Sequence, residues 1–260
     1  MSLVSETYQT IIVTTRRNTI QIQINRPEAE NSINDELLNE LIGVIRAVET
    51  DEEIKVLVIR GNKDHFCTGM DFQAVSGYSE DEMFRDNPDK YYELLQLITT
   101  SSKVVISCVE GKANAGGIGF IASSDIVLAK SDAVFSLSEA LFGLIPACVM
   151  PFLIRRVGHQ KAQWMAITTQ SVNASRAYEI GLADEVADNI DELLRRNLLR
   201  LTRLQPATIS TLKNYMNKLW IIDEDTRKLA VDQISNLVNS PLVRSNIRNF
   251  VEKGKFPWDK

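Results

Sequence analysis

The sequence predicts an α/β fold, because strand-like and helix-like segments alternate along most of its 260 residues. Two strand-like segments, IKVLVIRG from Ile54 to Gly61 and the later VVISCVEG, are apolar runs that stop at a glycine. Such runs are typical of strands that are buried on both faces of a sheet. With 44% hydrophobic and 24% charged residues, the chain has the composition of an ordinary globular protein.

The first elements are a strand pair and a helix. In TIIVTTRRNTIQIQINRP, β-branched residues alternate with polar ones on both sides of Arg17 and Asn18, which predicts a hairpin whose second strand ends at Pro27. Asn34 then precedes DELLNELIGVIRAVETD, in which apolar residues recur at helical spacing behind an acidic first turn. We therefore expect a helix that starts directly after Asn34.

The same alternation continues through the middle of the chain. A helical stretch from Lys90 to Thr100 precedes VVISCVEG, and a helix that starts near Gly116 precedes the strand DIVLAKS. The polar segment from Gln73 to Asp89 has weak periodicity. It is open whether this segment is mobile and lies beside a site or is a plain surface loop.

The C-terminal part has a different pattern. From about Asn197 onward the sequence is helical, and no low-complexity linker separates it from the preceding part. We predict a core of residues 1–196 and a helical C-terminal region of residues 197–260, which packs on the core or on a neighbouring subunit.

Charge and composition argue against several classes of protein. The formal net charge of -5 provides no general field that attracts nucleic acid. No apolar run reaches the roughly 18 residues of a membrane-spanning helix, and the start lacks a signal segment, so we expect a cytoplasmic protein that binds neither membrane nor nucleic acid. The widely spaced Cys67, Cys108 and Cys148 favour reduced thiols, and two histidines leave little material for a metal site.

Two predicted strands end in glycine-containing turns, in HFCTGMDF and in ANAGGIGF. Backbone N–H groups at such turns are not crowded by side chains, so two turns can aim two donors at one developing oxyanion. The alternative is that the Gly-Gly pair only permits close packing of a helix. GGIGF also lacks the GxGxxG spacing and the GK[ST] ending of a phosphate-binding loop, which argues against a nucleotide site.

Glu139 is the one acidic residue of the segment FSLSEALFG. Apolar neighbours such as Phe135 and Phe142 predict a raised carboxyl pKa, which suits proton transfer near neutral pH. A helix-start or surface glutamate is the alternative that spacing alone leaves open. His65 and His159 are isolated, and a lone histidine usually has a structural hydrogen bond rather than a chemical role.

Several longer motifs extend over essentially the whole chain. They are INRPEAENSIN, FCTGMDF, GKANAGGIGF, SSDIVLAKSDAVFSLSEALFGLIP, RRVGHQKAQWM, ASRAYEIGLADEV and FVEKGKFPW. In this order and spacing the chain resembles the crotonase superfamily of enoyl-CoA hydratases and isomerases. The resemblance implies an α/β crotonase spiral of ββα units, with a helical C-terminal region that is used for trimer formation.

The resemblance also implies the catalytic groups. By position, the backbone N–H groups of Met70 and Gly116 hold the thioester carbonyl. Hydratases with two glutamates have them at the positions of Gly119 and Glu139, and this sequence has a glycine at the first. A single base beside an enolate-binding site fits removal of an α-proton, whereas simple water addition by a glutamate pair is in doubt.

Within the superfamily, NAGGIGF, SLSEALFGLIPACVMPFLIRR and FPW look most like the dehydratases of polyketide β-branching cassettes. This implies that Glu139 takes the C2 proton of a 3-hydroxy-3-methylglutaryl group on acyl carrier protein (ACP). Loss of the C3 hydroxyl then gives 3-methylglutaconyl-ACP, and the same carboxylate protonates the departing hydroxyl. No cofactor is implied beyond the phosphopantetheine of ACP or of CoA.

Other residues are candidates for substrate contacts, and the resemblance implies where the carrier enters. Asn114 and Cys148 orient the hydroxyl or a water, or are packing residues. The sequence does not determine the cation for the substrate's free carboxylate, for which Lys112, His65, Arg85 and Lys90 are candidates. The pantetheine entrance is lined by Arg26, Glu28, Ala29, Glu30, Phe250 and Lys253.

We also expect a homotrimer or a dimer of trimers. The tail segment SNIRNFVEKGK has apolar Ile247, Phe250 and Val251 at helical spacing, and these side chains need a surface that covers them.

Three other functions stay open. An enoyl-CoA hydratase or isomerase of fatty-acid or amino-acid breakdown would share the fold and Glu139, and carrier preference separates it from the dehydratase. A methylglutaconyl decarboxylase would need no base, and release of carbon dioxide would identify it. A noncatalytic or RNA-binding protein of this fold would show salt-sensitive binding to nucleic acid.

Overall fold

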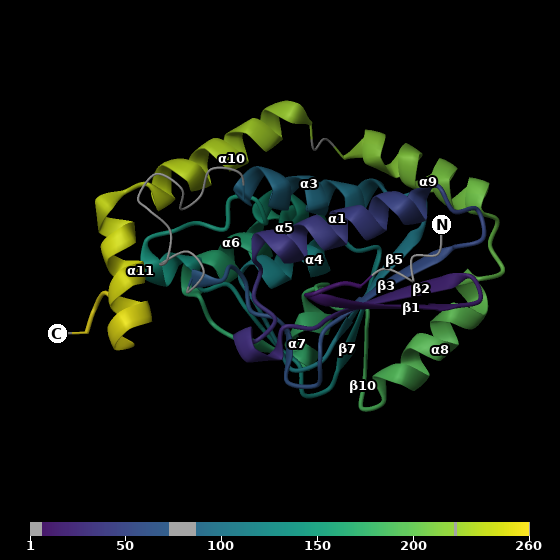
Figure 1. Cartoon of the computed structure of the whole chain (residues 1–260), viewed down its shortest axis with the longest axis horizontal. Helices are drawn as coiled ribbons and strands as arrows, with labels where there is room; N and C mark the ends of the chain where they lie inside the picture. Colours follow the sequence, from purple (N-terminus) through teal and green to yellow (C-terminus); the bar gives the residue numbers. More distant parts are fainter. Residues whose placement is uncertain (1–6, 73–86, 221–222, 260) are drawn as a thin grey trace.

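The chain folds into two sheets with helices around them (Figure 1). The computed structural model describes residues 7–72, 87–220 and 223–259. The segment from Gln73 that we expected to be a mobile segment or a loop therefore lies mostly outside the described residues, and the same holds for Arg85.

The larger sheet has six strands, which are parallel except for the antiparallel pair at one edge. In spatial order they are β1 (Ile11–Arg16), β2 (Thr19–Ile24), β3 (Val56–Arg60), β5 (Val104–Val109), β7 (Ile126–Lys130) and β10 (Glu185–Ala187). The β1–β2 pair is the predicted hairpin, and Arg17 in its turn has a φ of 52°.

The smaller sheet is built from short strands that follow the long ones. In spatial order they are β4 (His65–Cys67), β6 (Lys112–Asn114), β8 (Val134–Ser136) and β9 (Val172–Asn173). Each of β3, β5 and β7 is thus followed by a short strand of the second sheet before the next helix. This repeat confirms the predicted spiral of ββα units.

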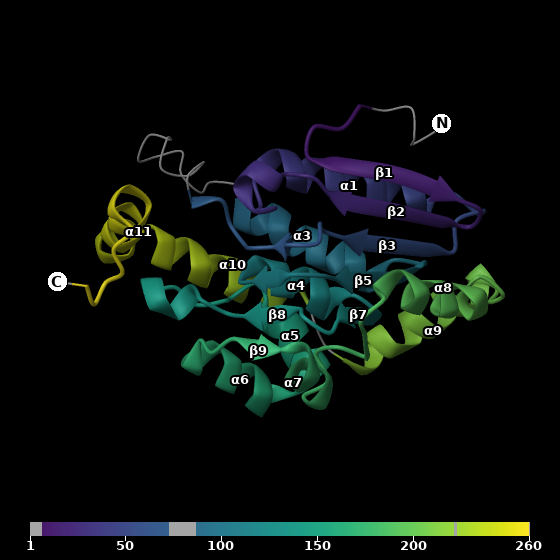
Figure 2. The ribbon, with the colours of Figure 1, turned by 90° about the horizontal axis from the view of Figure 1, so that it is seen from below.

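Helices cover both faces of the large sheet (Figures 1 and 2). The α-helices are α1 (Asp35–Glu49), α3 (Asn87–Thr100), α4 (Gly116–Ser123), α5 (Met150–Val157), α6 (His159–Thr168), α7 (Ala174–Glu179), α8 (Ile190–Leu201), α9 (Pro206–Leu219), α10 (Glu224–Val238) and α11 (Pro241–Lys253). The described residues also form the short 3-10 helices η2 (Pro27–Ala29) and η3 (Glu139–Phe142). As predicted, α1 starts after Asn34, whose side chain accepts a hydrogen bond from Leu37 N at 2.9 Å.

The strands of the large sheet are apolar on both faces because two separate cores lie against them. Leu57 and Ile59 of β3 belong to the main core, whereas Val56 and Val58 pack in a second core with Ile209 of α9 and residues of α8. Alternate side chains of a strand point to opposite faces, so a strand between two cores must be apolar at every position.

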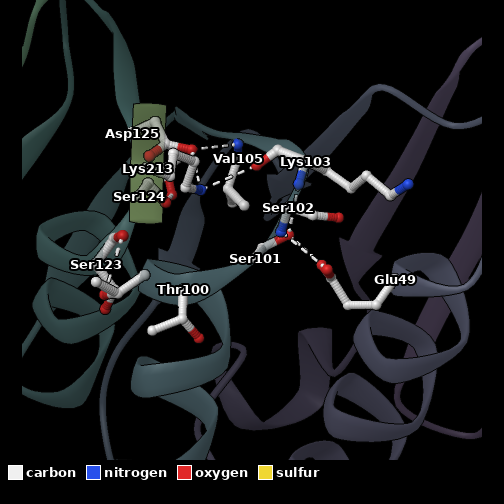
Figure 3. A network of polar contacts seen from close by, with 12 residues as sticks. Glu49, Thr100, Ser101, Ser102, Lys103, Val105, Ser123, Ser124, Asp125 and Lys213 are labelled. Carbon is white, nitrogen blue, oxygen red and sulfur yellow. Dashed lines mark hydrogen bonds and ion pairs between the residues drawn. The ribbon is translucent and has the colours of Figure 1, made fainter. Parts of the chain in front are cut away.

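The C-terminal helices are attached to the sheet at the starts of β5 and β7 (Figure 3). Lys213 of α9 donates to Lys103 O at 2.9 Å and to the Asp125 carboxylate at 2.6 Å. Asp125 Oδ2 also accepts from Val105 N at 2.8 Å. The predicted division at residues 196 and 197 falls inside α8, and that division stays a prediction.

The apolar face of α11 is covered by the chain itself. Ile247 is buried in a cluster with Leu144 and Val238, and the ring centroid of Phe250 lies 5.1 Å from that of Phe142. We had expected these tail residues to need the surface of another subunit. Because η3 and α10 supply that surface, this helix face is no argument for a trimer.

The three cysteines are buried free thiols. Within the part of the chain that the structure describes, no helix is long and apolar enough to cross a membrane.

Candidate active site

The two glycine turns of the sequence meet in space. One follows β4 and has Gly69 at a φ of +92°, and the other follows β6 and has Ala115 at a φ of 47°. A Cβ atom added at Gly69 would lie 2.7 Å from Ala115 Cβ and 3.2 Å from Gly116 N. Only a glycine permits this approach, so the turns are held against each other.

The turn after β4 leaves the Met70 N–H without a strand partner. Ile33 N donates to Gly69 O at 2.7 Å, and Asp71 N donates to Ile33 O at 3.0 Å. In parallel pairing of this kind, Ile33 bonds to the residues on either side of Met70, so the N–H and C=O of Met70 point away from Ile33. Met70 is also one of the residues that line a cavity.

The turn after β6 presents the Gly116 N–H. Gly116 is the first residue of α4, where N–H groups have no acceptor inside the helix, and Ala115 offers no side chain that caps it. A left-handed φ at an alanine is a strained conformation of the kind found at functional sites. At Gly117, an added Cβ would lie 2.2 Å from Cys67 O, so glycine is required for α4 to pack on β4.

Both turns line an apolar cavity of about 90 Å³. Its polar side chains are the carboxylate of Glu139, the phenol of Tyr91 and the thiol of Cys148. The other lining residues are Met70, Phe72, Pro88, Ala115, Gly116, Leu144, Ile145, Pro146, Ala147, Val149, Ile234 and Val238.

Glu139 is the titratable acid of this cavity. Its Oε2 atom is buried and has no hydrogen-bond partner among the described residues. Burial raises the pKa of Glu139 from 4.5 to about 7, although the backbone N–H groups of Glu139 and Ser138 lower it in part. The predicted rise is confirmed, and a surface glutamate is excluded even though the residue does begin η3. Near neutral pH this carboxylate can both take up and release a proton.

The sequence is similar to those of known proteins. The family model for enoyl-CoA hydratase/isomerase matches residues 14–260. The chain belongs to this family. It is 41% identical to the bacillaene synthase dehydratase PksH of Bacillus subtilis, over 97% of this chain and 98% of that protein. It is 28% identical to the 2,3-dehydroadipyl-CoA hydratase of Escherichia coli, over 68% of each chain.

The solved structures agree with the sequence matches. A crystal structure described as a polyketide biosynthesis enoyl-CoA hydratase from Bacillus subtilis superposes with a TM-score of 0.89. It is 40% identical to this chain and covers 96% of it, and the chain covers 100% of that structure. The expected crotonase fold is therefore confirmed.

In this member of the enoyl-CoA hydratase/isomerase family, the Asn114 side chain holds the segment that leads into Glu139. Its Nδ2 donates to Ser138 Oγ at 2.8 Å, and its Oδ1 accepts from Ser136 Oγ at 2.8 Å. Both ends of the amide are therefore occupied by β8 and the residue before Glu139. This geometry favours the packing alternative for Asn114 over direct contact with substrate.

Cys148 forms part of the cavity wall. Burial raises the pKa of this thiol to about 12, so it is protonated at neutral pH. Its Sγ lies 3.8 Å from Pro88 O, to which it is a weak donor. A protonated thiol at this place fills space and is not a nucleophile.

The structure does not bring the predicted cations to the cavity. His65 and Lys112 lie opposite each other in β4 and β6, and neither lines the cavity. His65 Nε2 is 3.6 Å from Glu30 Oε2, and Lys112 is exposed. Lys90 is not a lining residue in the described part of the chain, and Arg85 lies outside that part.

Arg26, one of the residues predicted at the pantetheine entrance, has mainly internal contacts. Its Nη2 is 2.8 Å from Asp71 Oδ2, and its Nη1 donates to Ser32 O at 2.6 Å. The guanidinium thus holds the residue that follows Met70. No local pattern predicts this contact, because Arg26 and Asp71 are 45 residues apart along the chain.

The other predicted entrance residues stay at the surface. Glu28 and Glu30 are exposed in and after η2, and Ala29 is half-buried. On α11, Lys253 is exposed and Phe250 is half-buried against Phe142. Their role as an entrance stays a prediction.

Tyr91 of α3 is the site residue that sequence reasoning missed. It lines the cavity, and its hydroxyl donates to Gly116 O at 2.5 Å. The only sequence signal was an aromatic residue at a buried helix position, which is indistinguishable from a packing residue.

Proposed function

We propose that the chain is the dehydratase of a polyketide β-branching cassette, which converts 3-hydroxy-3-methylglutaryl-ACP to 3-methylglutaconyl-ACP. One observation carries the proposal: among the described residues, an apolar cavity is lined by one acid, Glu139, and by the two turns of Met70 and Gly116. The 41% identity with a bacillaene synthase dehydratase over nearly the whole chain supports it.

The Glu139 carboxylate starts the reaction by removing a proton from C2 of the acyl thioester. The electron pair of the C–H bond forms an enolate, and negative charge develops on the thioester oxygen. The N–H groups of Met70 and Gly116 donate to that oxygen, and removing one such donor from an oxyanion hole costs about 10²–10³ in kcat.

The enolate then expels the group at C3. The C3–O bond breaks, the electron pair of the enolate forms the C2–C3 double bond, and the Glu139 carboxylic acid gives its proton to the departing hydroxide. Water leaves and the carboxylate is restored. A group with a pKa of about 7 suits both steps, because neither protonation state is strongly preferred near neutral pH.

We further infer a homotrimer or a dimer of trimers, now through a different surface. Leu212, Tyr215, Met216 and Leu219 are exposed on α9 and recur at the spacing of one helix face. An exposed apolar helix face favours contact between subunits. Sedimentation that shows only monomer at micromolar concentration would contradict this inference.

The proposed reaction is tested by presenting the 3-hydroxy-3-methylglutaryl group on ACP and, in parallel, on CoA. Mass spectrometry of the acyl group should show the loss of one water, fastest on ACP. A chain that instead hydrates straight-chain 2-enoyl-CoA and leaves the ACP substrate intact is a catabolic hydratase. Release of carbon dioxide from methylglutaconyl-ACP would identify a decarboxylase, and no change in any substrate would indicate a noncatalytic protein.

A further inference from the structure

The Tyr91 hydroxyl fills the space in which a side chain at residue 119 would begin. A Cβ atom added at Gly119 would lie 1.9 Å from the Tyr91 hydroxyl oxygen and 3.0 Å from its Cζ. Real Cβ atoms do not approach another atom this closely, so residue 119 and Tyr91 cannot both have side chains at these places.

The same hydroxyl is tied to the turn that carries the Gly116 N–H. Tyr91 donates to Gly116 O at 2.5 Å in a buried hydrogen bond. Burial raises the pKa of Tyr91 well above 10, and the nearby Glu139 charge adds to this, so the phenol keeps its proton while Glu139 titrates. The first turn of α4 is therefore held by a group on α3.

We propose that Tyr91 is a positioning and specificity-determining residue that restricts this site to one carboxylate. It occupies the place of a second glutamate, and it fixes the Gly116 turn against the cavity. The inference rests on the proposed function for its reaction, but its steric part holds for any substrate. The site then favours elimination by one acid–base group over water addition by two.

A thermal unfolding cycle tests the steric part without any substrate. An alanine in the middle of a helix is normally more stabilising than glycine. We expect Gly119→Ala to lower the midpoint temperature of unfolding of the parent chain by at least about 4 °C. In a Tyr91→Phe background the same substitution should lower it much less, because the hydroxyl that meets the new Cβ is gone. Equal shifts in the two backgrounds would overturn the proposal.

Steady-state kinetics test the positioning part. On the thioester that the parent chain dehydrates, Tyr91→Phe should lower kcat about 10-fold and leave KM nearly unchanged, because the ring stays and only the anchoring O–H is lost. Tyr92→Phe is the matched control: Tyr92 is also buried, and its hydroxyl has no hydrogen-bond partner among the described residues. Parent-like kcat in Tyr91→Phe, or equal losses in both variants, would overturn the proposal.

The two failures are distinguishable. If the parent chain does not dehydrate the ACP substrate, the proposed function is wrong, and the unfolding cycle still reports whether Tyr91 excludes a side chain at residue 119.

Discussion

Two regions of the molecule treat carboxylates in different ways. At the starts of β5 and β7, Asp125 accepts from Lys213 at 2.6 Å and from Val105 N at 2.8 Å (Figure 3). Glu49 nearby accepts from the Ser101 hydroxyl and from Ser102 N. In the cavity, Glu139 Oε2 has no partner among the described residues.

The difference shows how one chain separates stability from chemistry. A carboxylate with charged and N–H donors is stabilised as the anion and fixes the elements that supply those donors. A carboxylate with a buried oxygen that no described residue donates to, as at Glu139, costs stability as the anion, and the same cost raises its affinity for a proton. The first region attaches helices to the sheet, and the second prepares an acid–base group.

The largest expected effect is on turnover. Glu139→Gln keeps the size of the side chain and removes its ability to take up a proton. We expect a loss in kcat of about 10²–10⁴-fold with little change in binding, which is the usual contribution of general acid–base catalysis. In the parent chain, the rate should rise with pH through an apparent pKa of about 7. A folded Glu139→Gln variant with near-parent turnover would show that the base is another group.

An intermediate effect is expected on stability at the paired region. Asp125→Ala leaves Lys213 with only Lys103 O and leaves Val105 N without its acceptor. We expect a loss of about 2–3 kcal/mol in the free energy of unfolding, measured in denaturant. Asp132→Ala is the control, because its 2.7 Å ion pair with Lys130 is exposed and should change stability by less than about 1 kcal/mol. Similar losses in both variants would mean that burial of the Lys213 side chain is unimportant.

The smallest expected effect is the change in stability when a glutamate of either region is replaced by glutamine. Glu139→Gln should increase stability by about 1–2 kcal/mol at pH 8, whereas Glu49→Gln should decrease it by about 1 kcal/mol. Glu139 binds its proton more tightly in the folded chain, so the parent loses stability as pH rises from 4.5 to about 7. The gain in Glu139→Gln should therefore disappear below pH 4.5. Unfolding curves at pH 8 and below pH 4.5 check this. If Glu139→Gln and Glu49→Gln change the stability at pH 8 in the same direction, the comparison is contradicted.

Much of the fold could be predicted from local patterns. The hairpin at Arg17, the capped start of α1 at Asn34 and the apolar strand β3 each follow from residues close together in sequence. The glycine turns and the raised pKa of Glu139 were also accessible, because small residues and apolar neighbours are visible in the sequence itself.

The rest depended on contacts between distant residues. Tyr91 reaches Gly116 across 25 residues, and Arg26 reaches Asp71 across 45. The apolar face of α11 could equally have covered a partner subunit, and only the packing of Phe250 on Phe142 decided that it covers the chain itself. Sequence periodicity shows that a face is apolar but does not show what lies against it.

The sequence by itself determined the order of strands and helices, the glycine turns and the presence of one acid, Glu139, in an apolar segment. These are properties of neighbouring residues, which backbone sterics and local polarity control. Only the tertiary structure decided that Asn114 binds Ser138 beside Glu139, that Arg26 holds the Met70 turn and that Tyr91 fills the space beside Gly119. Those outcomes depend on which surfaces meet at close packing, and close packing is a property of the whole folded chain.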